Sequence, residues 1–134
     1  MKTEFFIPML PPETTHQTKQ VAVVKGKPQF YEPTELKEAR SKLSAHLARH
    51  VPPVKYTGAI RVIVKWCFPI TGKHQDGEYK ITKPDLDNAV KLLMDVMVSL
   101  GFFKDDAIVS SLILEKFWAA KPGIYISIES LEGR

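Results

Sequence analysis

The segment KPDLDNAVKLL, residues 83–93, places carboxylates directly before an apolar helical pattern. Asp85 and Asp87 are one residue apart, and two carboxylates this close repel each other unless a cation lies between them or one of them takes up a proton. Asn88 adds a neutral oxygen beside the pair. Mg²⁺ is bound in proteins by a few carboxylates, with water and phosphate completing its coordination. The segment therefore predicts a magnesium site suited to cutting a phosphodiester.

A capped helix start is the alternative interpretation of the same residues. Unpaired N–H groups and the positive end of the helix dipole stabilise a carboxylate in the first turn, and this explains one aspartate better than two. Lys91 follows Asp87 by four residues and can face the same way. It either forms an ion pair worth roughly 0.2–0.5 kcal/mol or stabilises charge that develops on a transferring phosphate. The spacing is compatible with both roles.

A second acidic pair, Asp105 and Asp106, follows Lys104 in the segment KDD. Taken alone it is typical of a polar turn between a helix and a strand. Together with Asp85 and Asp87 it offers three or four carboxylates, which is what two-metal phosphodiester chemistry requires. We therefore expect the two acidic pairs to converge and bind the metal together.

Other metal-binding and phosphate-binding patterns are absent from the sequence. An EF-hand loop counted from Asp85 would need glycine at Val90 and glutamate at Val96. The four histidines are scattered, and there is no Walker loop, no dinucleotide-binding glycine motif and no clustered His/Cys zinc pattern.

Hydrophobic patterns predict the elements that position these acids. Strands are expected at 4–9, 58–69, 107–119 and 124–130, a hairpin at 20–31, and helices at 33–50 and 85–100. The fold class is α/β of the α+β type, a small mixed sheet covered by two main helices. The long connection between strands 58–69 and 107–119 is expected to be a crossover. Such a crossover puts the two acidic pairs at opposite ends of the helix, unless residues past the turn run back along it.

Periodicity assigns faces to the key elements. Strand 58–69 should bury Val62, Val64, Trp66 and Phe68 on one face. The helix should bury the stripe made by Leu86, Ala89, Val90, Leu93, Val96, Met97 and Leu100. Asn88, Lys91 and Asp95 fall on its opposite side, and Gly101 is the expected C-terminal stop.

Length and composition predict one globular domain over residues 1–134. The chain has 44% hydrophobic and 25% charged residues, as soluble globular proteins do. Its apolar runs are too short to cross a membrane, and MKTEFFIPML lacks the pattern of a signal peptide. Cys67 is the single cysteine, which excludes an internal disulfide and favours a reducing cytoplasmic location. The net charge of +4 permits nucleic acid as a partner.

Basic residues surround the acidic pairs in the sequence. Lys73, His74 and Lys80 lie in the predicted flexible loop 70–83, and Lys83 and Lys104 flank the acids. Taken singly, each of these residues is typical of a solvated surface. Their position around the acidic pairs is what suggests that they contact DNA phosphates. Such contacts would make the affinity for DNA fall steeply with salt.

The blocks KPDLDNAVKLLMDVM and GFFKDDAIV, with every polar landmark present over residues 83–109, resemble the RusA-like Holliday junction resolvases. This resemblance implies a small homodimeric, Mg²⁺-dependent endodeoxyribonuclease, typical of phages and prophages, with Mn²⁺ as a possible substitute metal. It implies that Asp85, Asp87 and Asp106 are metal-binding and catalytic, that Asp105 is a neighbouring ligand, and that Lys91 is catalytic. The substrate implied is four-way branched DNA in recombination or repair, cut to a 5′-phosphate and a 3′-hydroxyl.

Two other functions fit the same sequence. A non-catalytic DNA-binding or phage scaffolding protein would use the acids only as caps and turns, and Mg²⁺ would then stabilise the fold little. A nuclease acting on flaps or other branched DNA would use the same metal chemistry with a different dimer shape.

Overall fold

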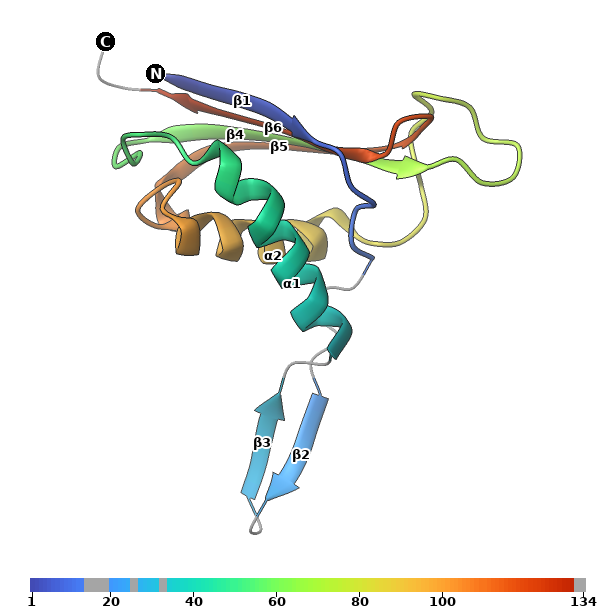
Figure 1. Cartoon of the computed structure of the whole chain (residues 1–134), viewed down its shortest axis with the longest axis horizontal. Helices are drawn as coiled ribbons and strands as arrows, with labels where there is room; N and C mark the ends of the chain where they lie inside the picture. The colour runs from blue at the N-terminus through green and yellow to red at the C-terminus, as the bar shows by residue number, and fades with distance from the viewer. Residues whose placement is uncertain (14–19, 25–26, 32–33, 132–134) are drawn as a thin grey trace.

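The computed structural model describes residues 1–13, 20–24, 27–31 and 34–131 (Figure 1). Four strands, β1 (Lys2–Ile7), β4 (Ile60–Pro69), β5 (Val109–Ala119) and β6 (Gly123–Ser130), form one sheet in the order β1-β6-β4-β5. The helices are α1 (Thr34–Leu47) and α2 (Leu86–Leu100), with short 3-10 helices η2 (Ala48–His50) and η3 (Asp106–Ile108). A separate hairpin pairs β2 (Gln20–Val24) with β3 (Lys27–Tyr31).

The sheet is mixed, as the sequence predicts. Strands β4 and β5 are parallel, and β6 is antiparallel to both β1 and β4. Helix α2 is the crossover that joins the two parallel strands. Both helices lie on the same side of the sheet (Figure 1). The expected mixed sheet with two main helices is therefore confirmed.

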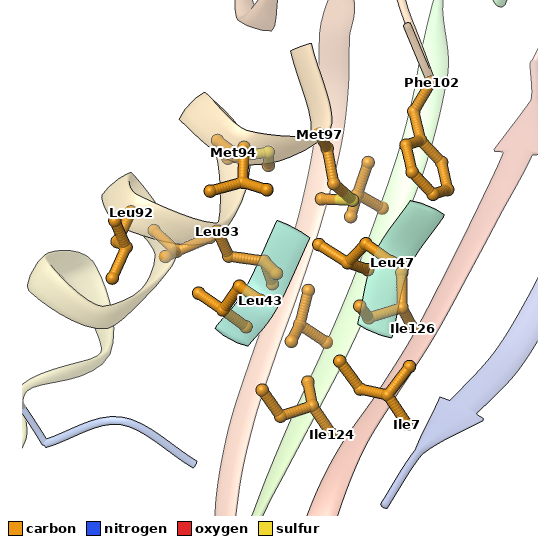
Figure 2. Packing of buried hydrophobic residues seen from close by; sticks show 14 of the residues in the cluster. Ile7, Leu43, Leu47, Leu92, Leu93, Met94, Met97, Phe102, Ile124 and Ile126 are labelled. Carbon is orange, nitrogen blue, oxygen red and sulfur yellow. The ribbon is translucent and has the colours of Figure 1, made fainter. Parts of the chain in front are cut away.

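The core lies between that face of the sheet and the helices. Val62, Val64, Trp66 and Phe68 of β4 are all buried, which confirms the alternation read from the sequence. Figure 2 shows how leucines and methionines of the two helices pack against isoleucines of β1 and β6 in this core. These residues are Leu43, Leu47, Leu92, Leu93, Met94, Met97, Ile7, Ile124 and Ile126.

Most predicted boundaries are correct to within a few residues. Strand β1 begins two residues earlier than expected and ends before Pro8, because proline has no N–H to donate to a sheet. The hairpin is confirmed, although its expected turn at 25–27 lies partly outside the described residues. Helix α2 ends at Gly101, whose φ of 90° is left-handed and whose N–H bonds to carbonyls of the last turn. No helix in the described part of the chain is long and apolar enough to cross a membrane.

Gly123 sits where β1 and β6 approach most closely, and its replacement tests that packing. A Cβ at this position would lie 2.1 Å from Phe6 Cζ and 2.6 Å from the backbone oxygen of Ile7. Because Ile7 is paired with Ile124, its oxygen has little room to move. We expect Gly123→Ala to lower the free energy of unfolding by about 1–3 kcal/mol, measured by urea denaturation. A change below about 0.5 kcal/mol, as at an ordinary surface site, would contradict this packing.

Candidate functional site

The start of α2 presents two exposed carboxylates. Asp85 is the N-cap residue by backbone conformation, with φ −69° and ψ 141°, yet its side chain makes no capping hydrogen bond. Asp87 follows in the first helical turn and is also exposed. A capping role would have engaged the Asp85 carboxylate with the N–H groups of the first turn. Helix capping therefore does not account for this aspartate.

Asn88 does not face the same way, and this corrects the expectation from periodicity. Its side chain is only 4% exposed, and its Oδ1 has no hydrogen-bond partner among the described residues. Leu92 and Met94, which lay outside the predicted stripe, are buried too. The cause is that α2 packs against α1 as well as the sheet, so more than one stripe of the helix is covered. Asn88 therefore supplies no oxygen beside Asp85 and Asp87.

A groove between α2 and β5 gathers charged side chains along the middle of the helix. Its lining includes Lys91, Asp95 and Asp106, together with the apolar residues Val90, Met94, Val109 and Leu112. Asp95 is on the predicted polar face of α2 and was not among the predicted site residues. The available signal was its spacing, because Asp87, Lys91 and Asp95 recur every fourth residue and so share one side of a helix.

The two acids of the second pair have different roles in the turn. The Asp105 side chain caps η3 by accepting a hydrogen bond from Ala107 N at 3.0 Å, and this bond, followed by one with Asp106, lowers the pKa of Asp105. The hydrogen bond shared with Asp105 raises the pKa of Asp106, and the charges of Asp105 and Asp95 raise it further. Asp106 therefore shares a hydrogen bond with one acid and lies near another, Asp95, a setting that a bound cation would relieve.

The two acidic pairs lie at different ends of α2 within one chain. Residues of η3 run back only as far as Asp95 and Lys91. Lys91 is four residues after Asp87, which is roughly 6 Å along a helix. Oxygen ligands of Mg²⁺ lie about 2.0–2.1 Å from the ion, and no three His, Cys, Asp or Glu side chains of the described residues come close enough to hold one metal. A single chain in this conformation thus does not assemble a three-carboxylate site.

Comparison with known proteins decides the family. The family model described as Endodeoxyribonuclease RusA matches residues 10–129. The chain belongs to the RusA endodeoxyribonuclease family. The crossover junction endodeoxyribonuclease rusA of Lactococcus phage r1t is 32% identical over 130 residues, covering 96% of this chain and 98% of the phage protein. The uncharacterized protein YqaN of Bacillus subtilis strain 168 is 26% identical over 121 residues, covering 82% and 84% of the two chains.

Membership of the RusA family makes the chain an endodeoxyribonuclease and confirms the resemblance read from residues 83–109. The matched range contains both acidic pairs, Lys91 and the basic residues around them. The roles of the individual side chains still rest on their chemistry and position.

Lys80 occupies a different environment from the exposed loop position expected for it. Its side chain is only 6% exposed and lies over the rings of Phe68, at 5.0 Å, and Trp118, at 4.7 Å. Its ammonium donates hydrogen bonds to Thr82 Oγ1 at 2.5 Å and to the Lys83 carbonyl. Burial lowers the pKa of Lys80, and the charge of Lys116 lowers it further. Because the buried ammonium is bonded within the chain, we do not include Lys80 among the DNA contacts of this RusA-family protein.

The other basic residues remain exposed. Lys73 and Lys83 lie in the loop before α2, and Lys104 lies after it beside Asp105. His74 already has two partners, since its Nδ1 is 2.5 Å from Glu78 Oε2 and its ring stacks on Trp118 at 4.3 Å. The hydrogen bond from His74 lowers the pKa of Glu78. A phosphate contact by His74 would have to compete with that carboxylate.

Proposed function

We propose that this RusA-family endodeoxyribonuclease is Mg²⁺-dependent and resolves four-way DNA junctions as a homodimer, in recombination or repair. The observation that carries the proposal is the pair of exposed carboxylates at the start of α2, Asp85 and Asp87, because the N-cap residue Asp85 makes no capping hydrogen bond. The similarity to a phage protein named for crossover junction cleavage supports this substrate.

Dimerisation is supported by the open edge of the sheet at β5. This strand is the last in the sheet order, and among the described residues its outer edge is paired only near its C-terminal end, where Tyr79 bridges Phe117. Leu112 and Ile113, in its open part, are each 43% exposed. Unpaired strand edges with apolar side chains are sites where another chain adds. We infer that a second copy pairs along this part of β5.

A dimer of this kind would also bring the acidic pairs together. Homodimers generally have two-fold symmetry with the same surface on both copies, and two copies of one strand related in this way pair antiparallel. An axis near Leu112 would set Val109 opposite Glu115 of the partner subunit. In the same register Ile108 would lie opposite Lys116 of the partner subunit, with Asp106 just beyond it, and that lysine contacts the segment that leads into α2. Each active site would thus take the start of α2 from one copy and Asp106 from the other.

The residues of this composite site have complementary roles. Asp85 and Asp87 would hold Mg²⁺ together with Asp106 of the partner subunit, while Asp105 positions the turn through its bond to Ala107. When bound, the metal supplies an activated water and polarises the scissile phosphate. Lys91, one turn after Asp87 on the same side of α2, would stabilise negative charge on the phosphate. The exposed Lys73, Lys83 and Lys104 would offset the repulsion between the acids and DNA.

The test is a cleavage assay on junction, flap and duplex DNA with and without Mg²⁺. We expect paired nicks in the four-way junction, with 5′-phosphate and 3′-hydroxyl ends, only when Mg²⁺ or Mn²⁺ is present. Preferential cutting of flaps would keep the nuclease chemistry and replace the proposed substrate. Junction binding without any cutting in either metal would favour a DNA-binding or scaffolding protein and would overturn the proposal.

A further inference from the structure

Two lysine side chains hold the backbone that leads into the acidic pair of α2. Lys116, on β5, donates from its Nζ to the Thr82 carbonyl at 2.5 Å and to the Pro84 carbonyl at 2.7 Å. Lys80 donates to Thr82 Oγ1 and to the carbonyl between these two, that of Lys83. Three consecutive carbonyls directly before Asp85 are therefore bound by ammonium groups.

The same segment is fixed to β5 by backbone hydrogen bonds. Lys80 N bonds to Lys116 O at 3.0 Å, and Trp118 N bonds to Glu78 O at 2.8 Å. These bonds bring residues 78–80 alongside the end of β5 and set both lysines beside residues 82–84. The strand that follows Asp106 in sequence thereby determines where the chain enters α2.

Burying a lysine is unfavourable unless its charge is well bonded. The burial of Lys80 therefore suggests that this side chain has a specific role. Lysine is almost never fully buried without a partner, and the charge of Lys116 adds repulsion to the desolvation of Lys80. The two aromatic rings and the carbonyls offset that cost. In an ordinary exposed loop, water would supply the hydrogen bonds to these carbonyls. The lysines instead give the backbone before Asp85 one defined path.

We propose that Lys116, assisted by Lys80, is a positioning residue that orients the Asp85 and Asp87 carboxylates for the metal. This inference rests on the proposed function. Asp85 is the residue next to the Pro84 carbonyl, and its side chain gains no orientation from a capping bond. The direction of its carboxylate therefore follows from the backbone that Lys116 holds. Groups that orient metal ligands in this way change metal affinity or activity by about 10–100-fold when they are lost.

The test compares Lys116→Met, Lys116→Arg and the control Lys65→Met. Methionine keeps the apolar stem of lysine and removes its donors, whereas arginine keeps the charge and several donors. Lys65 is also a partly exposed strand lysine, but its Nζ lies 3.8 Å from Glu115 and over the ring of Tyr125, both on strands of the sheet. Lys80 is left unchanged because its burial makes misfolding the expected result of its removal.

Three measurements separate positioning from general damage. For Lys116→Met we expect the Mg²⁺ concentration at half-maximal junction cleavage to rise about 10–100-fold, while the Kd for the junction without metal changes less than about 3-fold. Ala89 N–H bonds to the Asp85 carbonyl, so amide hydrogen exchange of residues 89–91, measured without metal, should speed up while exchange in β4 and β6 stays unchanged. Lys116→Arg should recover most of the metal affinity, and Lys65→Met should match the wild type.

Several outcomes would overturn the positioning role of Lys116. Unchanged Mg²⁺ dependence in Lys116→Met, or a loss that Lys116→Arg does not recover, would overturn the positioning role and leave the proposed function intact. A loss that is matched by an equal rise in the junction Kd would assign Lys116 to DNA binding and would also overturn it. If the wild type cuts no junction in Mg²⁺, the proposed function fails first and the positioning role fails with it.

Discussion

Asp87→Asn is expected to abolish junction cleavage while leaving the folded protein and its affinity for DNA intact. Asparagine has nearly the shape of aspartate but no charge, so it weakens metal binding without altering packing around an exposed side chain. A bound metal contributes several kcal/mol of transition-state stabilisation, and each 1.36 kcal/mol is tenfold in rate. We expect the single-turnover rate at fixed Mg²⁺ to fall by roughly 10²–10⁴-fold.

The matched control for this variant is Glu38→Gln. Glu38 is an exposed acid on α1, so its change removes the same charge away from the proposed site. It should cleave at the wild-type rate, and both variants should keep the wild-type melting temperature. Equal cleavage by Asp87→Asn and the wild type would refute the assignment of this carboxylate to the metal.

Two inactive variants are expected to restore activity to each other if the site is shared between subunits. Consider Asp87→Asn co-expressed with Asp106→Asn. In a mixed dimer one site carries both substitutions, and the other combines an intact α2 start with an intact Asp106. Random pairing makes about half of the dimers mixed, so about a quarter of all sites are intact for a two-fold dimer. We expect nicking at about a quarter of the wild-type rate, as single nicks rather than paired cuts.

The control for complementation is Asp85→Asn co-expressed with Asp87→Asn. Both changes lie at the start of α2, so every site of a mixed dimer contains one of them and no activity should return. The two mixtures have the same charge per dimer, which separates site composition from electrostatics. If the mixture of Asp87→Asn and Asp106→Asn stays inactive although mixed dimers form, the three acids act within one chain and the shared site is wrong.

The elements of this fold were largely predictable because its hydrophobic patterns are regular. Strand β4 alternates strictly, since one of its faces covers the core and the other does not. Helix α2 has a clear apolar stripe, and Gly101 stops it by adopting a left-handed conformation. Phe102 and Phe103, directly after this stop, are fully buried. The crossover separates the two acidic pairs, and the turn after α2 brings Asp106 back to the middle of the helix, beside Lys91 and Asp95.

Side-chain environments that depend on distant elements were harder to predict. Periodicity gives the direction of a helix's buried face but not how much of the helix neighbouring elements cover, so the burial of Asn88 was missed. Glycines and charges around Lys80 indicated an exposed loop, whereas Phe68 and Trp118, from two strands, enclose it. The partners of Lys116 lie about thirty residues before it in sequence, at Thr82 and Pro84. No local sequence pattern indicates contacts between residues this far apart in the chain.

The central claim is that carboxylates from the two ends of α2 meet around one divalent ion in the assembled protein. The most direct measurement is a crystal structure grown with Mn²⁺, in which anomalous scattering locates the metal. We predict one peak per active site, bound by Asp85 and Asp87 of one copy and by Asp106 of the partner subunit. A structure in which Asp106 lies far from both other aspartates in every copy, or in which Mn²⁺ binds elsewhere, would contradict it.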